Sequence, residues 1–497
     1  MKKPMQESVN EQRPEKIFAD AKEVEITRAI AKEFYDVLQD RAESDVIIIG
    51  AGAAGITLAK TLADTGKSVA LVEGGGLEYS NQSQNIYKGV VTGDPYLKLD
   101  TARLRFLGGS TNHWAGFCRS FEEVDFQRAY LGVEYKWPID FKDIEHYKKE
   151  ACSILEIPSE FEEEKQKSSN IKSIKFQFSP PVRFKEKYFK ELETSILITV
   201  FVNSNLASFK GSSRKIQAIK IKSYNGNELS LSGEKVVLAM GGIENSRFLL
   251  WAEARYQNTF FDGDLPIGRY WMEHPHFTLG QALIDKRKVS KRFYSLTGDA
   301  QKKLNIMNCG FRVEFFNDNA TKELIRDVLC VAPNLGKNLA RLAGKNLVCG
   351  IKFRASWEQA PDKNNAVTLG DTQDAFGIPR VNLYWKKTPL DRKTVKKSVA
   401  EFNSWLMEID GGRIKLDEWM LTDNKYPEND ELAGNHHMGG TRMHESKIYG
   451  VVDSNCKVYG SENLYVAGSS LFTTGGHNNP TLPIVQLALR LADHLSS

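Results

Sequence analysis

The segment DVIIIGAGAAGITLAKTLADTGKSVALVEGG, residues 45–75, constrains the fold more than any other part of the chain. A short apolar run over residues 46–49 meets a glycine-rich turn, and a helix-compatible stretch then continues to residue 62. A second apolar run over residues 69–72 ends at Glu73. Short apolar runs separated by a turn and a helical stretch are typical of buried strands in an α/β fold. This segment therefore predicts a strand–turn–helix–strand unit.

The glycines and the acidic residue of this unit stand where a dinucleotide needs them. Gly50 permits a tight turn, Gly52 allows the backbone to approach a pyrophosphate, and Gly55 lets the helix pack on the strand. The helix N-terminus adds unpaired N–H groups and a partial positive charge. The carboxylate of Glu73 can accept both hydroxyls of an adenosine ribose. A structural turn with accidental glycines is the less favoured alternative, and the motif alone fits nicotinamide and flavin dinucleotides equally well.

Size, charge and cysteine content restrict the class of protein. A chain of 497 residues can form two or three domains with sizeable cores. The 67 Lys and Arg residues are interleaved with 63 Asp and Glu residues, and a net charge of +4 gives no reason to expect nucleic-acid binding. The six cysteines lie far apart without a CxxC pair, which indicates free thiols of a reducing compartment instead of disulfides or a zinc site.

The sequence shows no targeting signal and no membrane-spanning segment. The basic N-terminal tip is followed by no apolar h-region, and no stretch approaches the roughly 20 apolar residues that a spanning helix needs. Cytoplasmic localisation is therefore the default expectation, with export alongside a signal-bearing partner as the alternative. Residues 1–44 are expected to form a helical extension, because Ile26, Ala29, Ile30 and Phe34 have helical spacing.

The rest of the chain consists of two glycine-rich blocks around a looser middle. Residues 194–240 alternate β-rich runs with polar turns, a helix is predicted around 391–408, and glycine-punctuated sequence returns at 434. The end, ENLYVAGSS followed by NPTLPIVQLALRLADHL, predicts a buried strand, a loop and a helix. These changes indicate one domain assembled from discontinuous pieces, into which a second domain is inserted.

Five motifs, in order along the chain, resemble those of the glucose–methanol–choline (GMC) oxidoreductases, which are FAD-dependent and act mostly on alcohols and sugars. They are RFLGGSTNHWAGFCRSF (105–121), VVLAMGGIENSRFLL (236–250), LPIGRYWMEHPH (265–276), HHMGGTRM (436–443) and the C-terminal segment that begins with NLYVAGSS. Within the family they look nearest to the pyranose 2-oxidase and the fructose or gluconate dehydrogenase branches. The resemblance implies that the dinucleotide is FAD.

The implied fold is α/β, with a Rossmann-type FAD-binding domain and an inserted α+β substrate domain of antiparallel sheet plus helices. The expected segments are an N-terminal helical extension (1–44), a first FAD-binding part (45–125), a lid or substrate segment (126–187), a second FAD-binding part (188–270), a substrate-binding domain (271–430) and a third FAD-binding part with the catalytic residues (431–497).

Residue by residue, the resemblance also implies the cofactor-binding positions. They are Gly50, Gly52, Gly55 and Glu73 for the ADP half, Gly108, Gly109 and Ser110 beside the flavin, Leu206 at the adenine, Gly468 near the ribityl and pyrophosphate groups, and Asn479. His113 stands where covalently flavinylated relatives carry a flavin-linked histidine. A histidine that only stacks or hydrogen-bonds near the cofactor is the alternative at that position.

The resemblance places two catalytic residues, His437 and Asn479, in the C-terminal part. An alkoxide donates hydride to flavin N5 more readily than an alcohol does, and an imidazole, with an ordinary pKa of about 6.5, can take the hydroxyl proton. His437 is therefore the expected base, with Gly439 and Gly440 allowing the backbone to approach the flavin. The amide of Asn479 is expected to orient the substrate oxygen. N-capping of the last helix, with Pro480 as its first residue, is the competing role for Asn479.

Two further histidines and one tryptophan have less specific signals. His436 should point away from its neighbour His437, because adjacent residues on an extended segment face opposite sides, and a hydrogen-bonded packing role is favoured for it. His477 and Trp357 are weak candidates for the substrate pocket. For Trp357, ordinary core of the substrate domain is the favoured interpretation.

The MEHPH motif is expected to be structural. His274 and His276 flank Pro275, which breaks helical spacing, and no further ligand cluster accompanies them. No metal site is therefore expected. The aromatic residues Tyr384 and Trp385 are similarly assigned to the core of the substrate domain and not to sugar stacking.

These features predict an FAD-dependent oxidoreductase that oxidises a CH–OH group of a sugar, polyol or related alcohol. The expected partner is the small-molecule substrate, and the electron acceptor is left open. One alternative is the catalytic subunit of a multi-component dehydrogenase, which passes electrons to a cytochrome or quinone through a small or haem partner subunit. The other is a non-redox FAD-containing lyase on the same scaffold.

Overall fold

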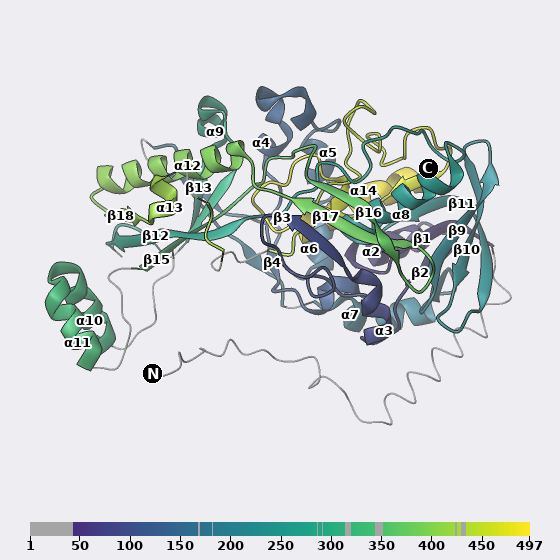
Figure 1. The fold of residues 1–497 in the computed structure, drawn as a ribbon, viewed down its shortest axis with the longest axis horizontal. Coiled ribbons are helices and arrows are strands. Elements are labelled where there is room, and N and C mark those ends of the chain that lie inside the picture. The colour runs from purple at the N-terminus through teal and green to yellow at the C-terminus, as the bar shows by residue number, and fades with distance from the viewer. Residues whose placement is uncertain are drawn as a thin grey trace.

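The computed structural model describes residues 43–166, 169–180, 182–285, 287–290, 292–313, 320–342, 351–422, 425–428 and 434–497. The helical extension predicted for residues 1–44 lies outside these residues, except for its last two, which belong to the first strand. Figure 1 shows two main bodies of secondary structure, one around the purple and yellow ends of the described chain and one around the green helix α12.

A seven-stranded sheet carries the first glycine-rich segment. Its strands are β1 (Glu43–Ile49), β2 (Val69–Val72), β8 (Ile198–Phe201), β9 (Asn205–Ser212), β10 (Lys215–Lys222), β11 (Glu228–Leu238) and β19 (Leu464–Val466). Strands β8, β2, β1, β11 and β19 are parallel, and β10 and β9 continue the sheet from β11 as an antiparallel ribbon. This arrangement confirms the predicted Rossmann-type domain, built from discontinuous parts of the chain.

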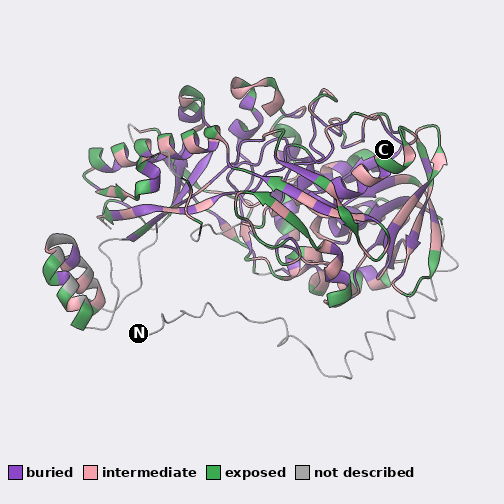
Figure 2. Ribbon diagram, viewed as in Figure 1, coloured by how far each residue is buried: buried purple, intermediate pink, exposed green. Residues whose placement is uncertain are grey.

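Three helices cover this sheet and bring the two ends of the domain together. Helix α2 (Ala53–Asp64) follows β1, α8 (Gly241–Tyr256) follows β11, and α14 (Thr481–Ser496) packs against α2. The apolar side chains of α2 and α14 belong to the same buried cluster as the strands. Figure 2 shows these buried residues in purple along the sheet and the helices on it. The burial of apolar surface is the main force that holds the last helix on the first one.

A second seven-stranded sheet, entirely antiparallel, forms the inserted domain. Its spatial order is β18 (Gly412–Leu416), β12 (His276–Ile284), β15 (Ile351–Trp357), β14 (Cys309–Arg312), β13 (Phe293–Leu296), β6 (Ile171–Ile174) and β5 (Glu163–Lys165). Helix α12 (Pro389–Glu408) packs on it, and the ring of Phe402 stacks on Phe353 at 5.4 Å. The predicted antiparallel substrate domain is confirmed, and two of its strands come from the 126–187 segment.

A small third sheet connects the two bodies. It contains β16 (Ala366–Gln373), β17 (Pro379–Trp385) and β3 (Gly89–Gly93), with β17 parallel to β3. Residues predicted for the substrate domain therefore pair directly with a strand of the first FAD-binding part. Trp271 and Trp385 are fully buried in the core of this sheet.

Shorter elements complete the described fold. They are α3 (Asn81–Gln84), η3 (Asn85–Tyr87), η4 (Gly109–Asn112), β4 (Phe117–Cys118), α4 (Glu123–Phe126), η5 (Arg128–Leu131), η6 (Val133–Tyr135), α5 (Lys142–Glu145), α6 (Lys148–Ile154), β7 (Gln177–Phe178), α7 (Phe184–Thr194), α9 (Gly298–Leu304), α10 (Ala320–Val331), α11 (Pro333–Leu342), α13 (Glu418–Leu421) and η7 (Ser469–Leu471). Strands β4 and β7 pair with each other, and so do helices α10 and α11.

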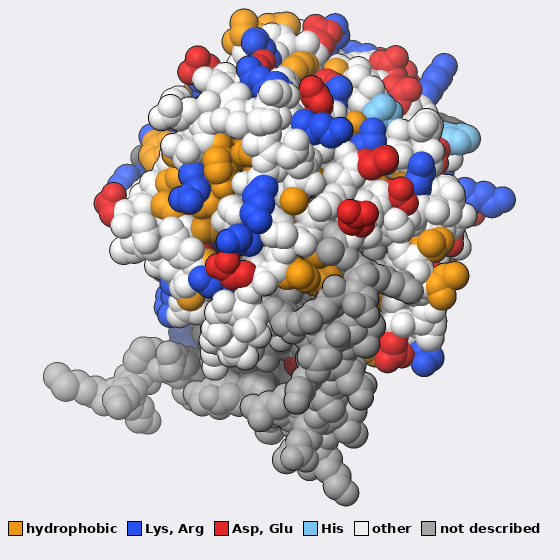
Figure 3. Space-filling view, turned by 90° about the vertical axis from the view of Figure 1, so that its right-hand side faces the viewer, with side chains coloured by type: hydrophobic (Ala, Val, Ile, Leu, Met, Phe, Trp, Pro, Cys, Tyr) orange, Lys and Arg blue, Asp and Glu red, His pale blue; other side chains and the backbone are white. Residues whose placement is uncertain are grey.

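The surface and the thiols fit the sequence analysis. Figure 3 shows one face on which Lys and Arg side chains are mixed with Asp and Glu side chains. Four cysteines, Cys118, Cys152, Cys309 and Cys456, are buried free thiols. Within the described ranges, every helix is too short or too polar to cross a bilayer.

Candidate active site

The glycines of the first turn perform three different tasks. Gly50 has a φ of +108°, and a Cβ there would lie 2.4 Å from the carbonyl oxygen of Ala239. A Cβ on Gly55 would lie 1.9 Å from the carbonyl oxygen of Gly50, so that only glycine lets α2 approach the strand so closely. Gly52, at the N-cap of α2, has no heavy atom within 4 Å of its missing Cβ. Its backbone is therefore open to a ligand at the helix N-terminus.

Glu73 is buried beside this turn and holds two main-chain N–H groups. Its Oε2 accepts a hydrogen bond of 3.0 Å from the N–H of Ala51, and its Oε1 accepts one of 2.8 Å from the N–H of Gly75. A carboxylate has about four lone-pair sites, so acceptor capacity remains for hydroxyl groups of a ligand. The arrangement fits the ribose contact that the sequence predicts for Glu73.

A cavity of about 460 Å³ opens at this turn and extends to the C-terminal glycine-rich block. Its volume lies within the range of small-molecule and cofactor sites. The predicted site residues that line it are Gly50, Gly52, Glu73, Gly109, Ser110, His113, Leu206, His437, Gly468 and Asn479. Gly55 lies behind this lining, and Gly108 donates its N–H to the carbonyl oxygen of Ala51 at 2.8 Å. Residues far apart in the chain thus meet in one site.

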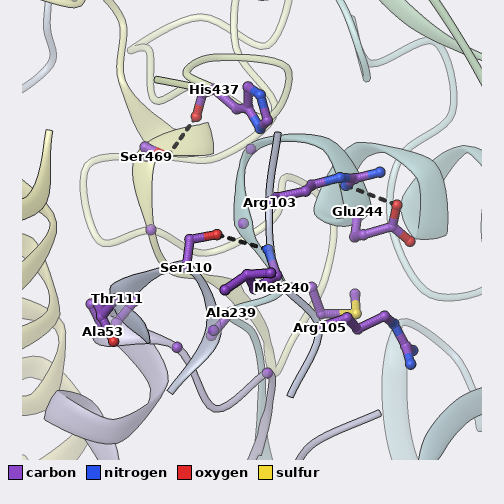
Figure 4. A pocket seen from close by; sticks show the side chains of 18 of the residues that line it. Ala53, Arg103, Arg105, Ser110, Thr111, Ala239, Met240, Glu244, His437 and Ser469 are labelled. Carbon is purple, nitrogen blue, oxygen red and sulfur yellow. Dashed lines mark hydrogen bonds and ion pairs between the residues drawn. The ribbon is translucent and has the colours of Figure 1, made fainter. Parts of the chain in front are cut away.

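Two arginines that the sequence analysis did not single out also line the cavity. The guanidinium of Arg103 lies 3.8 Å from the ring centre of Tyr87 and pairs with Glu244 at 3.0 Å (Figure 4). Arg105 donates to Asn205 at 2.7 Å, and its guanidinium occupies the space that a side chain at Gly74 would need. The alternation in RLRF, directly before the predicted LGGS loop, was the available signal. Both arginines suit a cavity that takes a pyrophosphate.

The backbone at His437 is fixed from several sides. Its carbonyl oxygen accepts a hydrogen bond of 2.6 Å from the hydroxyl of Ser469, as Figure 4 shows. Met438 forms a β-bridge with Met272. The next glycines have positive φ values, and a Cβ on Gly439 would lie 2.2 Å from the carbonyl oxygen of Tyr270. At Gly440 a Cβ would meet the hydroxyl of Ser246 at 2.4 Å. These glycines make room for the protein itself on the side of the missing Cβ, and the close approach of their backbone to the flavin stays a prediction.

The His437 imidazole lines the cavity in its neutral form. Its Nε2 lies 3.1 Å from the hydroxyl oxygen of Tyr96, and its ring lies 5.7 Å from that of Trp271. Burial, with a smaller contribution from the charge of Arg103, lowers the pKa of His437 to about 3. At neutral pH the ring is therefore uncharged, with one unprotonated nitrogen.

Asn479 contacts the other histidine of the pair. Its Nδ2 lies 3.1 Å from Nε2 of His436, and Nδ1 of His436 lies 2.8 Å from Nδ1 of His274. His436 also lines the cavity, although the sequence assigned it a packing role. Helix α14 begins at Thr481, one residue later than predicted, and Asn479 does not cap it. The Asn479 amide is therefore available at the cavity, but opposite His436 and not His437.

The structure does not bring the weaker candidates into the cavity. Trp357 is fully buried and stacks against Phe277 at 5.7 Å in the core of the inserted domain. His477 is buried between Phe176, at 6.4 Å, and the charge of Glu122, outside the cavity lining. The favoured interpretation of Trp357 as ordinary core is therefore confirmed, and the weak substrate-pocket assignment of both residues is corrected, because both rings are buried outside the cavity.

The remaining histidine predictions concern a metal and a covalent link. Burial lowers the pKa of His274 to about 3 and that of His276 to about 4. In the part of the chain that the structure describes, no cluster of three or more His, Cys, Asp or Glu side chains is arranged to hold a metal ion. His113 lies at the cavity, and burial and the charge of Arg183 lower its pKa. Its link to a flavin stays a prediction, with stacking as the alternative.

Two protein-family models match the chain. One, described as FAD dependent oxidoreductase, matches residues 45–157, and the other, described as GMC oxidoreductase, matches residues 361–488. The first match contains the glycine turn and Glu73. The second contains His437 and Asn479. The two matches therefore fall on the two ends of the chain that line the cavity.

Relatives and solved structures extend this similarity over the chain. The fructose dehydrogenase large subunit of Gluconobacter japonicus is 22% identical over 550 residues, covering 90% of this chain and 97% of the relative. Pyranose 2-oxidase of Lyophyllum shimeji is 26% identical over 133 residues, covering 27% of this chain and 20% of the relative. The crystal structure of pyridoxine 4-oxidase from Mesorbium loti shares the fold with a TM-score of 0.56 at 14% identity, covering 90% of this chain and 98% of that chain.

Proposed function

We propose that this chain, a member of the GMC oxidoreductases, uses FAD to oxidise a CH–OH group of a sugar, polyol or related alcohol. The observation that supports this most is the meeting of His437, Asn479 and the dinucleotide turn in one cavity. A proton acceptor, an amide and a cofactor cradle are the three parts that the oxidation of an alcohol needs. The two named sugar enzymes among the relatives favour a sugar or polyol over a simple alcohol.

The residues at the turn suit the cofactor. The backbone at Gly52 is open, Glu73 keeps acceptor sites for ribose hydroxyls, and Arg105 carries positive charge at the cavity. When bound, FAD supplies a two-electron acceptor for the hydride of the alcohol carbon. Gly52, Glu73 and Arg105 would hold its pyrophosphate and ribose groups.

His437 and Asn479 are the proposed catalytic residues. The neutral imidazole of His437 takes the hydroxyl proton of the alcohol, because an alkoxide releases hydride more readily than the alcohol does. The Asn479 amide then stabilises the charge that develops on the substrate oxygen. Both side chains lie among buried neighbours, where such interactions are stronger than in water.

A second candidate concerns the electron acceptor. The fructose dehydrogenase relative is a large subunit by name, and the chain covers 97% of its length. This favours a catalytic subunit that passes electrons to a cytochrome or quinone partner over an enzyme that uses oxygen. A non-redox lyase is the third candidate, favoured by no specific contact in the described structure.

The test is an anaerobic screen of the holoprotein with sugars, polyols and simple alcohols, monitored by flavin absorbance. We expect at least one sugar or polyol to bleach the flavin in the wild type and none to bleach it quickly in His437→Ala. Air is then admitted. Slow recovery of the absorbance supports the dehydrogenase subunit, and rapid recovery supports an oxidase. A flavin that dithionite reduces but no alcohol bleaches overturns the proposal.

A further inference from the structure

A buried carboxylate, Glu273, lies beside the main chain of His274 and His436. It is completely inaccessible to solvent. Its Oε1 accepts hydrogen bonds from the main-chain N–H of His274 at 2.8 Å and from that of His436 at 2.9 Å. Its Oε2 accepts a hydrogen bond from the hydroxyl of Tyr96. Several donors directed at one carboxylate favour its ionised form. Both of its oxygens accept from main-chain N–H groups, and this pattern opposes the effect of burial and favours the carboxylate over the acid.

The phenol ring of Tyr96 packs against two neighbouring tryptophan rings. It lies edge-on to Trp271 at 5.7 Å and to Trp385 at 5.1 Å. The indole N–H of Trp385 donates to Oε1 of Gln359 at 2.8 Å, and the main-chain N–H of Glu273 donates to the same oxygen at 2.9 Å. One buried network thus fixes the ring of Tyr96 and the carboxylate that receives its hydroxyl.

This network determines which nitrogen of His437 carries a hydrogen. An ionised carboxylate only accepts hydrogen bonds, so the hydroxyl hydrogen of Tyr96 points at Glu273. The hydroxyl oxygen, 3.1 Å from Nε2 of His437, then accepts from that nitrogen. The neutral imidazole consequently carries its hydrogen on Nε2. The lone pair is left on Nδ1, as in other sites where a hydrogen bond to one ring nitrogen sets the tautomer.

We propose that Glu273 and Tyr96 are positioning residues that hold His437 in the Nε2–H tautomer, so that Nδ1 takes the substrate proton. This inference rests on the proposed function for the identity of the reaction, but not for the tautomer. The hydroxyl proton of the alcohol moves to Nδ1, the electron pair of the C–H bond leaves as hydride to the bound FAD, and a carbonyl product forms. The resulting imidazolium keeps its Nε2–H on the Tyr96 oxygen. The charge of Glu273 stabilises the imidazolium through the Tyr96 hydroxyl, and no proton passes to the carboxylate.

The first test observes the tautomer itself. The holoprotein is labelled with ¹⁵N-histidine, and the ring signals of His437 are assigned with His437→Gln. We expect the wild type to show Nε2 protonated and Nδ1 unprotonated. Tyr96→Phe keeps the ring against the two tryptophans but removes the hydroxyl, and it should give a mixture of tautomers. An Nδ1–H signal in the wild type, or an unchanged signal in Tyr96→Phe, overturns the inference.

The second test is the rate of anaerobic flavin reduction by the best substrate of the screen. Tyr96→Phe should reduce the maximal rate of flavin reduction at least about tenfold, with little change in KM. This loss is a part of the hundredfold or more that a general base contributes to the rate. Tyr384→Phe is the matched control, since this hydroxyl lies on a half-exposed side chain next to Trp385 and should change neither quantity. A wild-type rate in Tyr96→Phe overturns the inference.

Glu273→Gln removes the charge and one acceptor together. Its amide NH2 must face either the main-chain N–H groups or the Tyr96 hydroxyl, so the preference for one His437 tautomer should weaken and the reduction rate should fall at least about tenfold. Equal FAD content in all variants shows that the fold is retained. If no alcohol reduces the wild-type flavin, the proposed function fails, and the tautomer experiment still decides on the positioning residues.

Discussion

The amide nitrogen of Asn479 lies 3.1 Å from Nε2 of His436, whereas Nε2 of His437 lies 3.1 Å from the hydroxyl of Tyr96. The two adjacent histidines thus have different partners within one cavity. Because adjacent side chains of an extended segment point in different directions, each imidazole ring contacts residues from a different part of the fold. This division makes the roles of the two histidines separable by substitution.

His437→Ala should retain FAD but lose at least about a hundredfold in the rate of flavin reduction, the lower end of what a general base contributes. The measurement is anaerobic stopped-flow mixing with the best substrate, normalised to the flavin absorbance of each preparation. An undiminished rate would remove His437 from the mechanism.

His436→Ala should have a smaller effect than His437→Ala. The Asn479 amide loses a hydrogen-bond partner, which typically contributes about 1 kcal/mol, so a roughly fivefold fall in kcat/KM is expected. The same stopped-flow series compares both variants. A larger loss in His436→Ala than in His437→Ala would show that the base is the histidine that contacts Asn479.

Glu73→Ala should weaken FAD binding about tenfold or more. The substitution leaves the N–H groups of Ala51 and Gly75 without their acceptor and removes the expected ribose contact. Titration of the apoprotein with FAD, followed by flavin fluorescence, gives the Kd. Glu234→Ala, on an exposed position of the same sheet, is the matched control and should keep the wild-type Kd.

The stability of the protein should depend on pH through His477. Burial lowers the pKa of His477 to about 3, while the unfolded chain has the ordinary value near 6.5, so the unfolded state binds more protons between these values. The free energy of unfolding that His477 contributes is present above pH 6.5 and is lost as the pH falls. At pH 5 the loss is up to about 2 kcal/mol, at 1.36 kcal/mol per pH unit.

Denaturant unfolding of the wild type and of His477→Gln at pH 7.5 and pH 5 measures this contribution. The wild type should lose more free energy of unfolding over this interval than the variant does. Equal losses, or a larger loss in His477→Gln, would contradict a buried neutral imidazole at this position.

The cofactor cradle was predictable because its residues are close together in the sequence. Gly50, Gly52, Gly55 and Glu73 lie in one segment, where local spacing reflects the geometry of a strand–turn–helix unit. His437 and Asn479 were found by a motif. Glu273 lies in the MEHPH motif, which the sequence analysis assigned a structural role, and Tyr96 lies in no quoted motif. The two residues come from separate segments, and only the fold brings them together at His437.

The weak substrate-pocket candidates His477 and Trp357 fail for one physical reason. Both rings are buried in packing contacts outside the cavity, which for Trp357 is the interpretation that the sequence favoured. The missing Cβ atoms of Gly439 and Gly440 would meet protein atoms, and the approach of these glycines to the flavin stays a prediction. Residue type indicates which chemistry a side chain can perform, and only tertiary packing decides which direction it faces.

The parallel pairing of β11 with β19, and of β3 with β17, has a consequence for biosynthesis. Leu464 to Val466 complete a sheet that begins at residue 43, and α14 then packs against α2. The ribosome must therefore synthesise the chain beyond residue 464 before this sheet can be completed. Until then the early strands expose unpaired edges, and nascent chains stalled before residue 464 are expected to depend on chaperones.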